Sequence, residues 1–240
     1  MKVVISQPRY LPALNYLQRL CFADLFVFLD TVQRQSRGWE NRNQILNGDQ
    51  AKWLTVPIRS SSRELIKHSI IDHPDWIKEH KLSLVKAYEK HPFFEKKSID
   101  AFYKDAEIVF QNSEGRFGAV ITHLLKNACA LFGFSPKIIL ASELPHTFDL
   151  SHGPAKLADI CKEIKATAYI SGPNGRAYGV REAFEGSPIK VYFHDFKHPQ
   201  YRQQGRSGFT PYLAFFDALF NVGFEKTKEW IHDKPVLSET

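Results

Sequence analysis

Hydrophobic positions in the first 30 residues follow three successive patterns. Lys2–Ser6 is a short apolar run, and Leu11–Ala23 carries a leucine at every third position. Asp24–Asp30 encloses five consecutive apolar residues, a pattern typical of a strand buried on both faces. Strand, helix and strand in this order predict a βαβ unit with a right-handed crossover.

Residues 31–49 are polar and end in Asn47-Gly48, a strong hairpin signal, after which Ala51–Ile58 has the pattern of a strand. We expect the two strands joined by the Asn47-Gly48 turn to form an antiparallel edge or a flap. Residues 74–134 then have a mostly helical pattern. The expected boundaries are a helix opening at Asp72-His73-Pro74, a break at His91-Pro92, and a long helix capped by Ser113 and ended by Gly133.

The C-terminal part alternates again between strand and helix patterns. The expected strands are Lys137–Ala141, Thr167–Ser171 and Ile189–Phe193, and the expected helices are Ser151–Lys165 and one from Thr210-Pro211 to Gly223. The fold class is therefore predicted as α/β, with a mostly parallel sheet built from βαβ units. A helical lobe at 74–134 is inserted in or flanks this sheet, within a single domain spanning 1–240.

Composition narrows the class of protein. Hydrophobic residues make up 43% and charged residues 24% of the chain, which is typical of a globular protein. Three distant cysteines form neither a disulfide framework nor a zinc cluster, so we expect reduced thiols. No leader pattern and no uncharged stretch of roughly 18 residues is present. We expect a cytoplasmic protein without membrane insertion.

The net charge of +6 is unevenly distributed. Residues 1–60 hold eight Lys or Arg against four Asp or Glu, and residues 190–206 hold four against one. Such basic segments suit an anionic small molecule such as a nucleotide sugar. They also suit a nucleic acid, or simply a solvated basic surface.

The first candidate site lies where the first strand meets its helix. Gln7, Arg9 and Tyr10 supply donors there, and ligands of open α/β sheets bind outside the carboxyl ends of strands. A helix N-terminus at that point favours an anion. The alternative is that Pro8 and Pro12 fix a turn on which Tyr10 packs.

A second group follows the next strand. Asp30 ends the apolar run, and its carboxylate is expected to hold a hydroxyl, act as a base or cap a turn. Gln33 lies just beyond it. Trp39, Asn41 and Arg42 then bring an aromatic ring, an amide and a guanidinium together, and arginine suits bidentate contacts to phosphate or carboxylate.

The C-terminal half adds further candidates. Ser171-Gly172-Pro173-Asn174-Gly175 follows a strand but is neither a P-loop nor a dinucleotide fingerprint. Asp217 lies on an apolar face, where a buried carboxylate needs an arginine partner or a capping role. No nucleophilic triad can be assembled, and we predict no metal or cofactor, although two histidines four apart are a zinc spacing on a helix. The candidates from this half are Ser171, Arg176, Tyr178, His194, Tyr201 and Asp217.

These segments resemble the WbqC-like protein family. The resemblance rests on Gln7–Pro12, Tyr16, Asp24–Asp30, Val32-Gln33, Trp39–Asn43, Tyr169–Tyr178 and Phe209–Asn221. It covers nearly the whole chain and is most specific in the first forty residues. Two positions depart from the family pattern: Asn15 stands where glycine is frequent, and the loop after Ser171 lacks the usual Asn-x-x-Gly-Gly order.

Members of this family resemble proteins that are encoded among genes for bacterial surface polysaccharide, especially O-antigen. The resemblance therefore implies a role in the synthesis of that polysaccharide. It would fit modification of an amino sugar by transfer of an acyl or aminoacyl group. The opening segment also looks like nucleotidyltransferases with a His-x-Gly-His signature, but 7–16 contains no histidine, so that likeness concerns the fold alone.

The first hypothesis is a transferase for a nucleotide sugar, with acyl-coenzyme A or an aminoacyl-tRNA as a candidate donor. Gln7, Tyr10 and Arg42 would hold the anionic part of the substrate, and Asp30 would be the base or hydroxyl ligand. Asp217 would complete the site from the other side, together with Ser171 and Tyr178. The alternatives are a module binding the end of a tRNA through stacked aromatic rings, and a scaffold without a deep polar pocket.

Overall fold

The computed structural model describes residues 1–35, 37–59, 64–145 and 152–239. Its strands are β1 Lys2–Ser6, β2 Leu25–Phe28, β3 Arg42–Asn47, β4 Gln50–Thr55, β5 Ile138–Leu140, β6 Ala168–Ser171, β7 Lys190–His194 and β8 Leu237–Ser238. Its helices are α1 Leu14–Phe22, α2 Trp76–Tyr88, α3 Lys96–Phe102, α4 Ala106–Asn112, α5 Phe117–Leu131, α6 Gly153–Glu163, α7 Phe215–Val222 and α8 Phe224–His232. Short 3₁₀ turns include η2 Ala141–Glu143, η4 Pro173–Tyr178 and η5 Glu182–Phe184.

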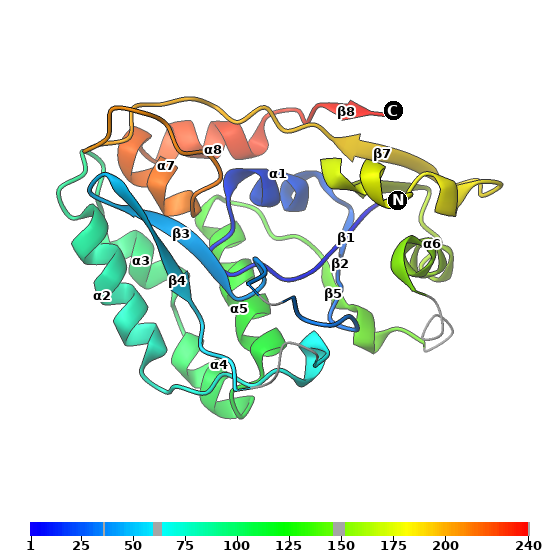
Figure 1. The fold of residues 1–240 in the computed structure, drawn as a ribbon, viewed down its shortest axis with the longest axis horizontal. Helices are drawn as coiled ribbons and strands as arrows, with labels where there is room; N and C mark the ends of the chain where they lie inside the picture. The colour runs from blue at the N-terminus through cyan, green and yellow to red at the C-terminus, as the bar shows by residue number, and fades with distance from the viewer. Residues whose placement is uncertain (36, 60–63, 146–151, 240) are drawn as a thin grey trace.

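The main sheet has six strands in the order β5-β2-β1-β6-β7-β8 (Figure 1). Every neighbouring pair is parallel except β7 with β8. The fold is therefore α/β with a mostly parallel sheet, as predicted. From β1 the chain builds outward through β2 to β5 on one side, and then returns to build β6 and β7 on the other. The strand order consequently reverses between β1 and β6.

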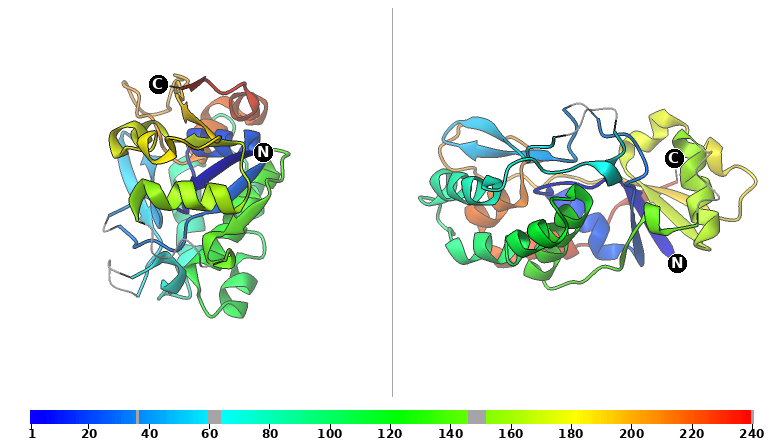
Figure 2. Two further views of the ribbon diagram at one scale, coloured as in Figure 1. Left: turned by 90° about the vertical axis from the view of Figure 1, so that its right-hand side faces the viewer. Right: turned by 90° about the horizontal axis from the view of Figure 1, so that it is seen from below.

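Alternate residues of the central strands enter two separate hydrophobic cores. Val4 and Phe26 pack with α1 and α5 on one face of the sheet. Val3 and Val27 pack with α6 and η5 on the other face. Figure 2 shows α6 lying against that face of the sheet. A strand covered on both faces must be apolar at every position, which explains the continuous apolar run that follows Asp24.

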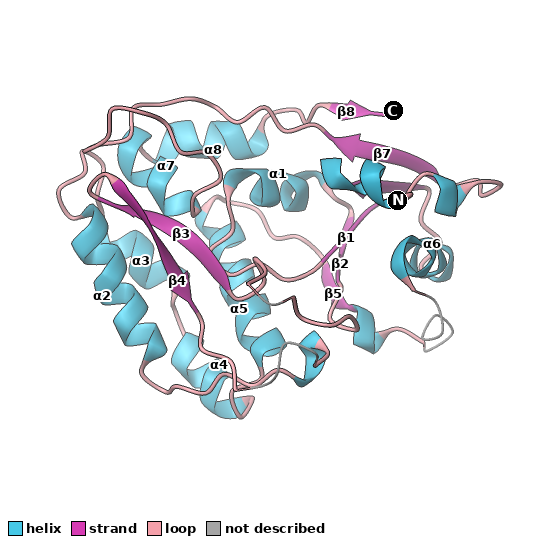
Figure 3. Cartoon of the chain, in the orientation of Figure 1, coloured by secondary structure: helices cyan, strands magenta, loops and turns pink. Residues whose placement is uncertain are grey.

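The hairpin prediction is confirmed. β3 and β4 pair antiparallel from Arg42↔Thr55 to Asn47↔Gln50, and Gly48 at the turn takes a positive φ of 67° that favours glycine. The two strands form a sheet of their own beside α2, apart from the six-stranded sheet (Figure 3).

Several helix starts and one helix count differ from the prediction, and α1 begins at Leu14 rather than at Leu11. The 74–134 region has four helices, because the chain turns at Asp105 (φ 57°) between α3 and α4. Ser113 does not cap α5, which begins only at Phe117. α7 begins at Phe215 rather than at Pro211, since the side chain of Gln203 bonds both the N–H and the C=O of Thr210. Gly223 ends α7 as predicted, but α8 follows at once.

Two further observations concern the predictions about the cysteines and about membrane insertion. The three cysteines are free thiols, and Cys129 and Cys161 are buried. Across the described residues, no helix combines the length and the apolar character that crossing a membrane requires.

Candidate functional site

A cavity of about 1200 Å³ opens at the carboxyl ends of β1 and β6. Its wall includes Ser6 and Gln7 at the end of β1, Ser171 and Gly172 at the end of β6, and the first turn of α6. This is the point at which the strand order reverses, where α/β sheets of this kind bind their ligands. The scaffold hypothesis predicted that such a pocket would be lacking.

The charged side chains that line the cavity are all cationic in the described part of the chain. They are Arg9, Arg19, Lys67 and Lys156, and no described lining residue is Asp or Glu. Arg19 and Lys156 are buried, while Arg9 and Lys67 are half-buried. A cleft lined by charge of one sign attracts ligands of the opposite sign. The cavity therefore suits an anion.

Two of these cations share one aromatic ring. The guanidinium carbons of Arg9 and Arg19 lie 5.6 Å and 5.3 Å from the ring centre of Tyr16, whose hydroxyl donates to the carbonyl of Gln7 at 2.8 Å. Burial, together with the positive charge of Arg9, lowers the pKa of Arg19 to about 10. Burial also lowers the pKa of Arg9, while the charge of Glu40 opposes that shift. We call Arg9 and Arg19 the arginine pair.

Sequence reasoning missed Arg19. It lies inside α1 between Leu17 and Leu20, and nothing in the leucine pattern indicates that it reaches the end of the sheet. Gly172 shows that it does, because a Cβ at Gly172 would stand 3.1 Å from Nη1 of Arg19. Asn15, Lys67, Lys156 and Tyr212 also line the cavity without having been predicted.

Aromatic side chains stand at the cavity with large exposed areas. Trp39, Tyr178 and Tyr212 all line it, and Tyr178 is 71% exposed. Tyr212 has a φ of 61°, which is uncommon for a residue other than glycine. Exposed rings of this kind stack against the flat faces of bases or sugars.

Three segments that carry the family resemblance meet beside the cavity. The N–H of Tyr10 donates to the carbonyl of Glu40 at 2.9 Å, and the Asn43 amide donates to the carbonyl of Leu11 at 2.6 Å. The N–H of Phe215 donates to the carbonyl of Pro12 at 3.0 Å. These bonds join the turn after β1 to the start of β3 and the start of α7. Asn43 thus acts within the fold and also touches the cavity.

The structure brings part of the predicted site together at the cavity. The predicted residues that line it are Gln7, Arg9, Gln33, Trp39, Ser171 and Tyr178. They come from the ends of β1 and β6 and from the segment that follows β2, so the strand-end argument placed them correctly in space. Whether they bind a substrate stays a prediction.

Tyr10, Asn41 and Arg42 do not line the cavity. The Tyr10 hydroxyl is buried against His80 Nδ1 at 2.7 Å and against the Tyr103 hydroxyl. The Asn41 amide donates to the carbonyl of Val56 at 2.8 Å. Arg42 donates to the carbonyls of Arg37 and Gly38 and lies 4.1 Å from the ring centre of Trp53. Each side chain points to a partner within the fold.

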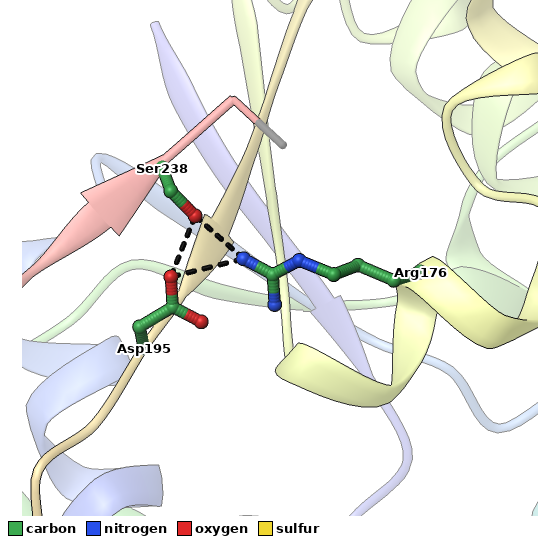
Figure 4. Close-up of polar contacts among 3 residues, drawn as sticks. All are labelled: Arg176, Asp195 and Ser238. Carbon is green, nitrogen blue, oxygen red and sulfur yellow. Dashed lines mark hydrogen bonds and ion pairs between the residues drawn. The ribbon is translucent and has the colours of Figure 1, made fainter.

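Arg176 is also directed elsewhere. Its guanidinium donates to Asp195 at 2.9 Å and to the Ser238 hydroxyl at 2.5 Å, and that hydroxyl donates to the same carboxylate (Figure 4). The hydrogen bond from Arg176 is the main cause that lowers the pKa of Asp195. This three-residue clasp ties η4, which lines the cavity, to β8 at the sheet edge. His194 bonds to Gln18 at 2.6 Å, and burial lowers its pKa to about 4.

Asp30 and Asp217, the two candidate catalytic carboxylates, lie outside the cavity wall. Asp30 is buried and accepts the backbone N–H of Ser142 at 2.9 Å and its hydroxyl at 2.6 Å, which fits the capping alternative. Asp217 is fully buried and accepts from Tyr201 and Gln203, both at 2.8 Å. Tyr88 donates to it at 3.3 Å. The predicted arginine partner is therefore wrong, since phenol and amide groups take that place.

Burial raises the pKa of Asp217 to about 6, and the three hydrogen bonds partly oppose this shift. Its partners come from α2 and from the segment before α7, so the cluster of Asp217, Tyr201, Gln203 and Tyr88 joins distant parts of the chain. We call it the Asp217 cluster. As for metal ligands, the described residues contain no grouping of three or more His, Cys, Asp or Glu side chains able to hold an ion.

The comparisons with known proteins agree with the sequence resemblance. The sequence profile of the WbqC-like protein family matches residues 7–229. The uncharacterized protein Rv1507c of Mycobacterium tuberculosis is 31% identical over 229 residues, which cover 93% of this chain and 95% of that protein. No solved structure matches significantly. The chain belongs to the WbqC-like protein family.

Proposed function

We propose that this member of the WbqC-like family is a transferase that binds a nucleotide-linked amino sugar in the cavity. It transfers an acyl group from acyl-coenzyme A, or an aminoacyl group from an aminoacyl-tRNA, to the amine of that sugar, and releases the coenzyme A thiol or the free tRNA. The reaction takes place during synthesis of a bacterial surface polysaccharide such as O-antigen. The observation that carries the proposal is the cavity itself, at the reversal of strand order, with four cationic lining side chains and no described lining carboxylate. The polysaccharide setting rests on the family resemblance.

The composition of the cavity wall supports a ligand with both an anionic and a ring-bearing part. Arg9, Arg19 and Lys67 favour the diphosphate, and the exposed ring of Tyr178 favours a base or sugar face. A volume of about 1200 Å³ accommodates a ligand larger than a single phosphate. Held together in such a cavity, donor and acceptor would react through proximity and orientation.

Acyl transfer to an amine also needs a group that accepts the proton of the attacking nitrogen. Asp30 would have to give up both contacts with Ser142 to do so. His152 lines the cavity at the start of α6, and a neutral imidazole nitrogen can accept a proton. We therefore propose His152 as the proton acceptor, with Asp30 retained as the alternative. His152→Asn should lower kcat and leave substrate affinity nearly unchanged.

The test is a thermal-shift panel of nucleotide sugars, acyl-coenzyme A species and tRNA, because ligands that bind the folded state raise Tm. The proposal expects one nucleotide sugar to raise Tm. Arg9→Gln should lower the affinity for that ligand about tenfold or more, since hydrogen bonds to charged groups contribute about 1.5–3 kcal/mol. Arg206→Gln is the matched control, because Arg206 donates to the carbonyl of Asp49 and does not line the cavity.

Other outcomes contradict the proposal in different ways. A shift with tRNA alone, falling steeply with added salt, would favour the nucleic-acid hypothesis. A nucleotide-sugar shift unchanged in Arg9→Gln would place that ligand outside the cavity. If no ligand raises Tm, the result would favour the scaffold hypothesis.

A further inference from the structure

Arg19 is a buried arginine to which the described residues supply neither a hydrogen bond nor an ion pair. Only 7% of the residue is exposed, and its Nε, like that of Arg206, is buried without a hydrogen-bond partner. No described carboxylate lies at ion-pair distance from it. A buried charge is costly unless it is paired, so a cation in this state is in place for a partner that the chain does not supply.

Other arginines of the chain show what a satisfied guanidinium looks like. Arg42 donates to two backbone carbonyls, Arg176 donates to Asp195 and Ser238, and Arg59 pairs with Asp72 at 2.7 Å. Arg19 instead has the second cation of the arginine pair close by, on the same ring of Tyr16. Glu40 attracts Arg9 through space, but its carboxylate oxygens are buried without a hydrogen-bond partner.

The position of the arginine pair is that of an anion site. Nη1 of Arg19 lies beside the backbone of Gly172, the first residue after β6, and Arg9 follows the end of β1. Ala13 and Asn15, at the start of α1, line the same cavity. The N-terminus of a helix carries partial positive charge and free N–H groups, which adds to the two guanidinium groups.

We propose that the arginine pair binds a phosphoryl dianion between the ends of β1 and β6. This inference rests on the proposed function for the identity of the whole ligand, of which the dianion would be the diphosphate. Planar guanidinium groups bind phosphoryl oxygens in pairs, which favours the phosphoryl group as occupant.

The inference predicts opposite effects of one substitution with and without the anion. Arg19→Gln removes a buried charge and its repulsion from Arg9, so Tm should rise by a few degrees in buffer free of multivalent anions. The same change should abolish the increase in Tm that inorganic pyrophosphate causes in the wild-type protein. Arg19→Lys keeps the charge and should retain part of that increase.

The experiment measures Tm of the wild type, Arg19→Gln, Arg19→Lys and the control Arg206→Gln with pyrophosphate, and with sodium acetate at matched ionic strength. The inference expects a shift with pyrophosphate that exceeds that with acetate and is lost only in Arg19→Gln. It is overturned if the wild type shows no such excess, if Arg19→Gln responds like the wild type, or if that variant melts lower without anion.

The two proposals fail separately. Loss of the pyrophosphate shift in Arg19→Gln, without any nucleotide sugar that binds, would support the dianion site and contradict the proposed function. A nucleotide sugar that binds the wild type and Arg19→Gln with equal affinity would support the function and overturn the role of Arg19.

Discussion

The cavity and the Asp217 cluster both contain buried polar side chains, but they differ in whether those side chains have hydrogen-bond partners. Asp217 receives hydrogen bonds from Tyr201, Gln203 and Tyr88, and it is completely enclosed. Arg19 is nearly as buried, yet its Nε has no partner in the described chain. A buried polar group with partners holds elements together, whereas one without partners costs stability. The difference supports our proposal that the cluster serves the fold and the cavity serves a ligand.

Removing the Asp217 carboxylate should have the largest effect on stability. Asp217→Ala leaves the donors of Tyr201 and Gln203 buried without acceptors, and each unsatisfied group costs about 1–3 kcal/mol. We expect the free energy of unfolding to fall by about 3 kcal/mol or more, measured by urea denaturation. A loss below about 1 kcal/mol would show that the cluster does not hold the fold and would reopen a catalytic role for Asp217.

The titration of Asp217 gives the next effect. Its pKa is raised from 3.8 to about 6, so ionisation costs more in the folded than in the unfolded state. Its contribution to stability is full below pH 3.8 and is lost as the pH rises through about 6, a change of about 3 kcal/mol. The stability advantage of wild type over Asp217→Asn should therefore shrink by most of that amount between pH 4 and pH 7.

Urea denaturation of both proteins at each pH measures this difference. His80, whose pKa burial lowers to about 4, destabilises both proteins equally in acid, because the unfolded imidazole binds protons more tightly. Its effect therefore cancels in the comparison. Parallel pH curves for the two proteins would contradict the raised pKa.

The clasp of Arg176, Asp195 and Ser238 should affect ligand binding more than stability, and both effects should be smaller than those at Asp217. Arg176 and Asp195 are about one-third exposed, so their ion pair contributes about 0.5 kcal/mol. Arg176→Ala should hardly change Tm. The same variant frees η4, which carries lining residues from Pro173 to Tyr178, and should weaken binding of a cavity ligand a few-fold. Unchanged affinity in a calorimetric titration would show that the clasp does not position the cavity wall.

Arg42→Gln should have the smallest effect on ligand binding. Its guanidinium is occupied by the carbonyls of Arg37 and Gly38 and stacks on Trp53, outside the cavity. We expect the affinity for any cavity ligand to stay within about twofold of the wild type, which corresponds to less than about 0.5 kcal/mol. A loss of binding with unchanged Tm would restore the role that the sequence predicted for Arg42.

Most strands of the main sheet could be predicted from the sequence. β2 and β6 are buried at every position, so their apolar runs could be recognised without knowing their neighbours. The rule that ligands bind at strand ends then placed Gln7 and Ser171 at the cavity correctly. The start of α7 could not be predicted, because the side chain of Gln203 decides the conformation at Thr210.

The direction of each side chain could not be read from the chain. Tyr10 and Arg42 lie near strand ends in sequence, but one enters the core beside His80 and the other bonds local carbonyls. Arg19 lies in a helix and reaches the sheet edge only through its long side chain. Asp217 was expected beside an arginine or in a capping role, whereas tyrosine and glutamine side chains from distant segments surround it. These contacts depend on packing between elements.

The most direct test is the position of a nucleoside diphosphate in a crystal of the complex. Crystals grown with uridine diphosphate should show the phosphoryl groups between the ends of β1 and β6, with phosphoryl oxygens about 3 Å from the guanidinium of Arg19. The ring-bearing part should lie toward Tyr178. A nucleotide bound elsewhere, for example along the basic segment 190–206 with Arg19 untouched, would contradict the account.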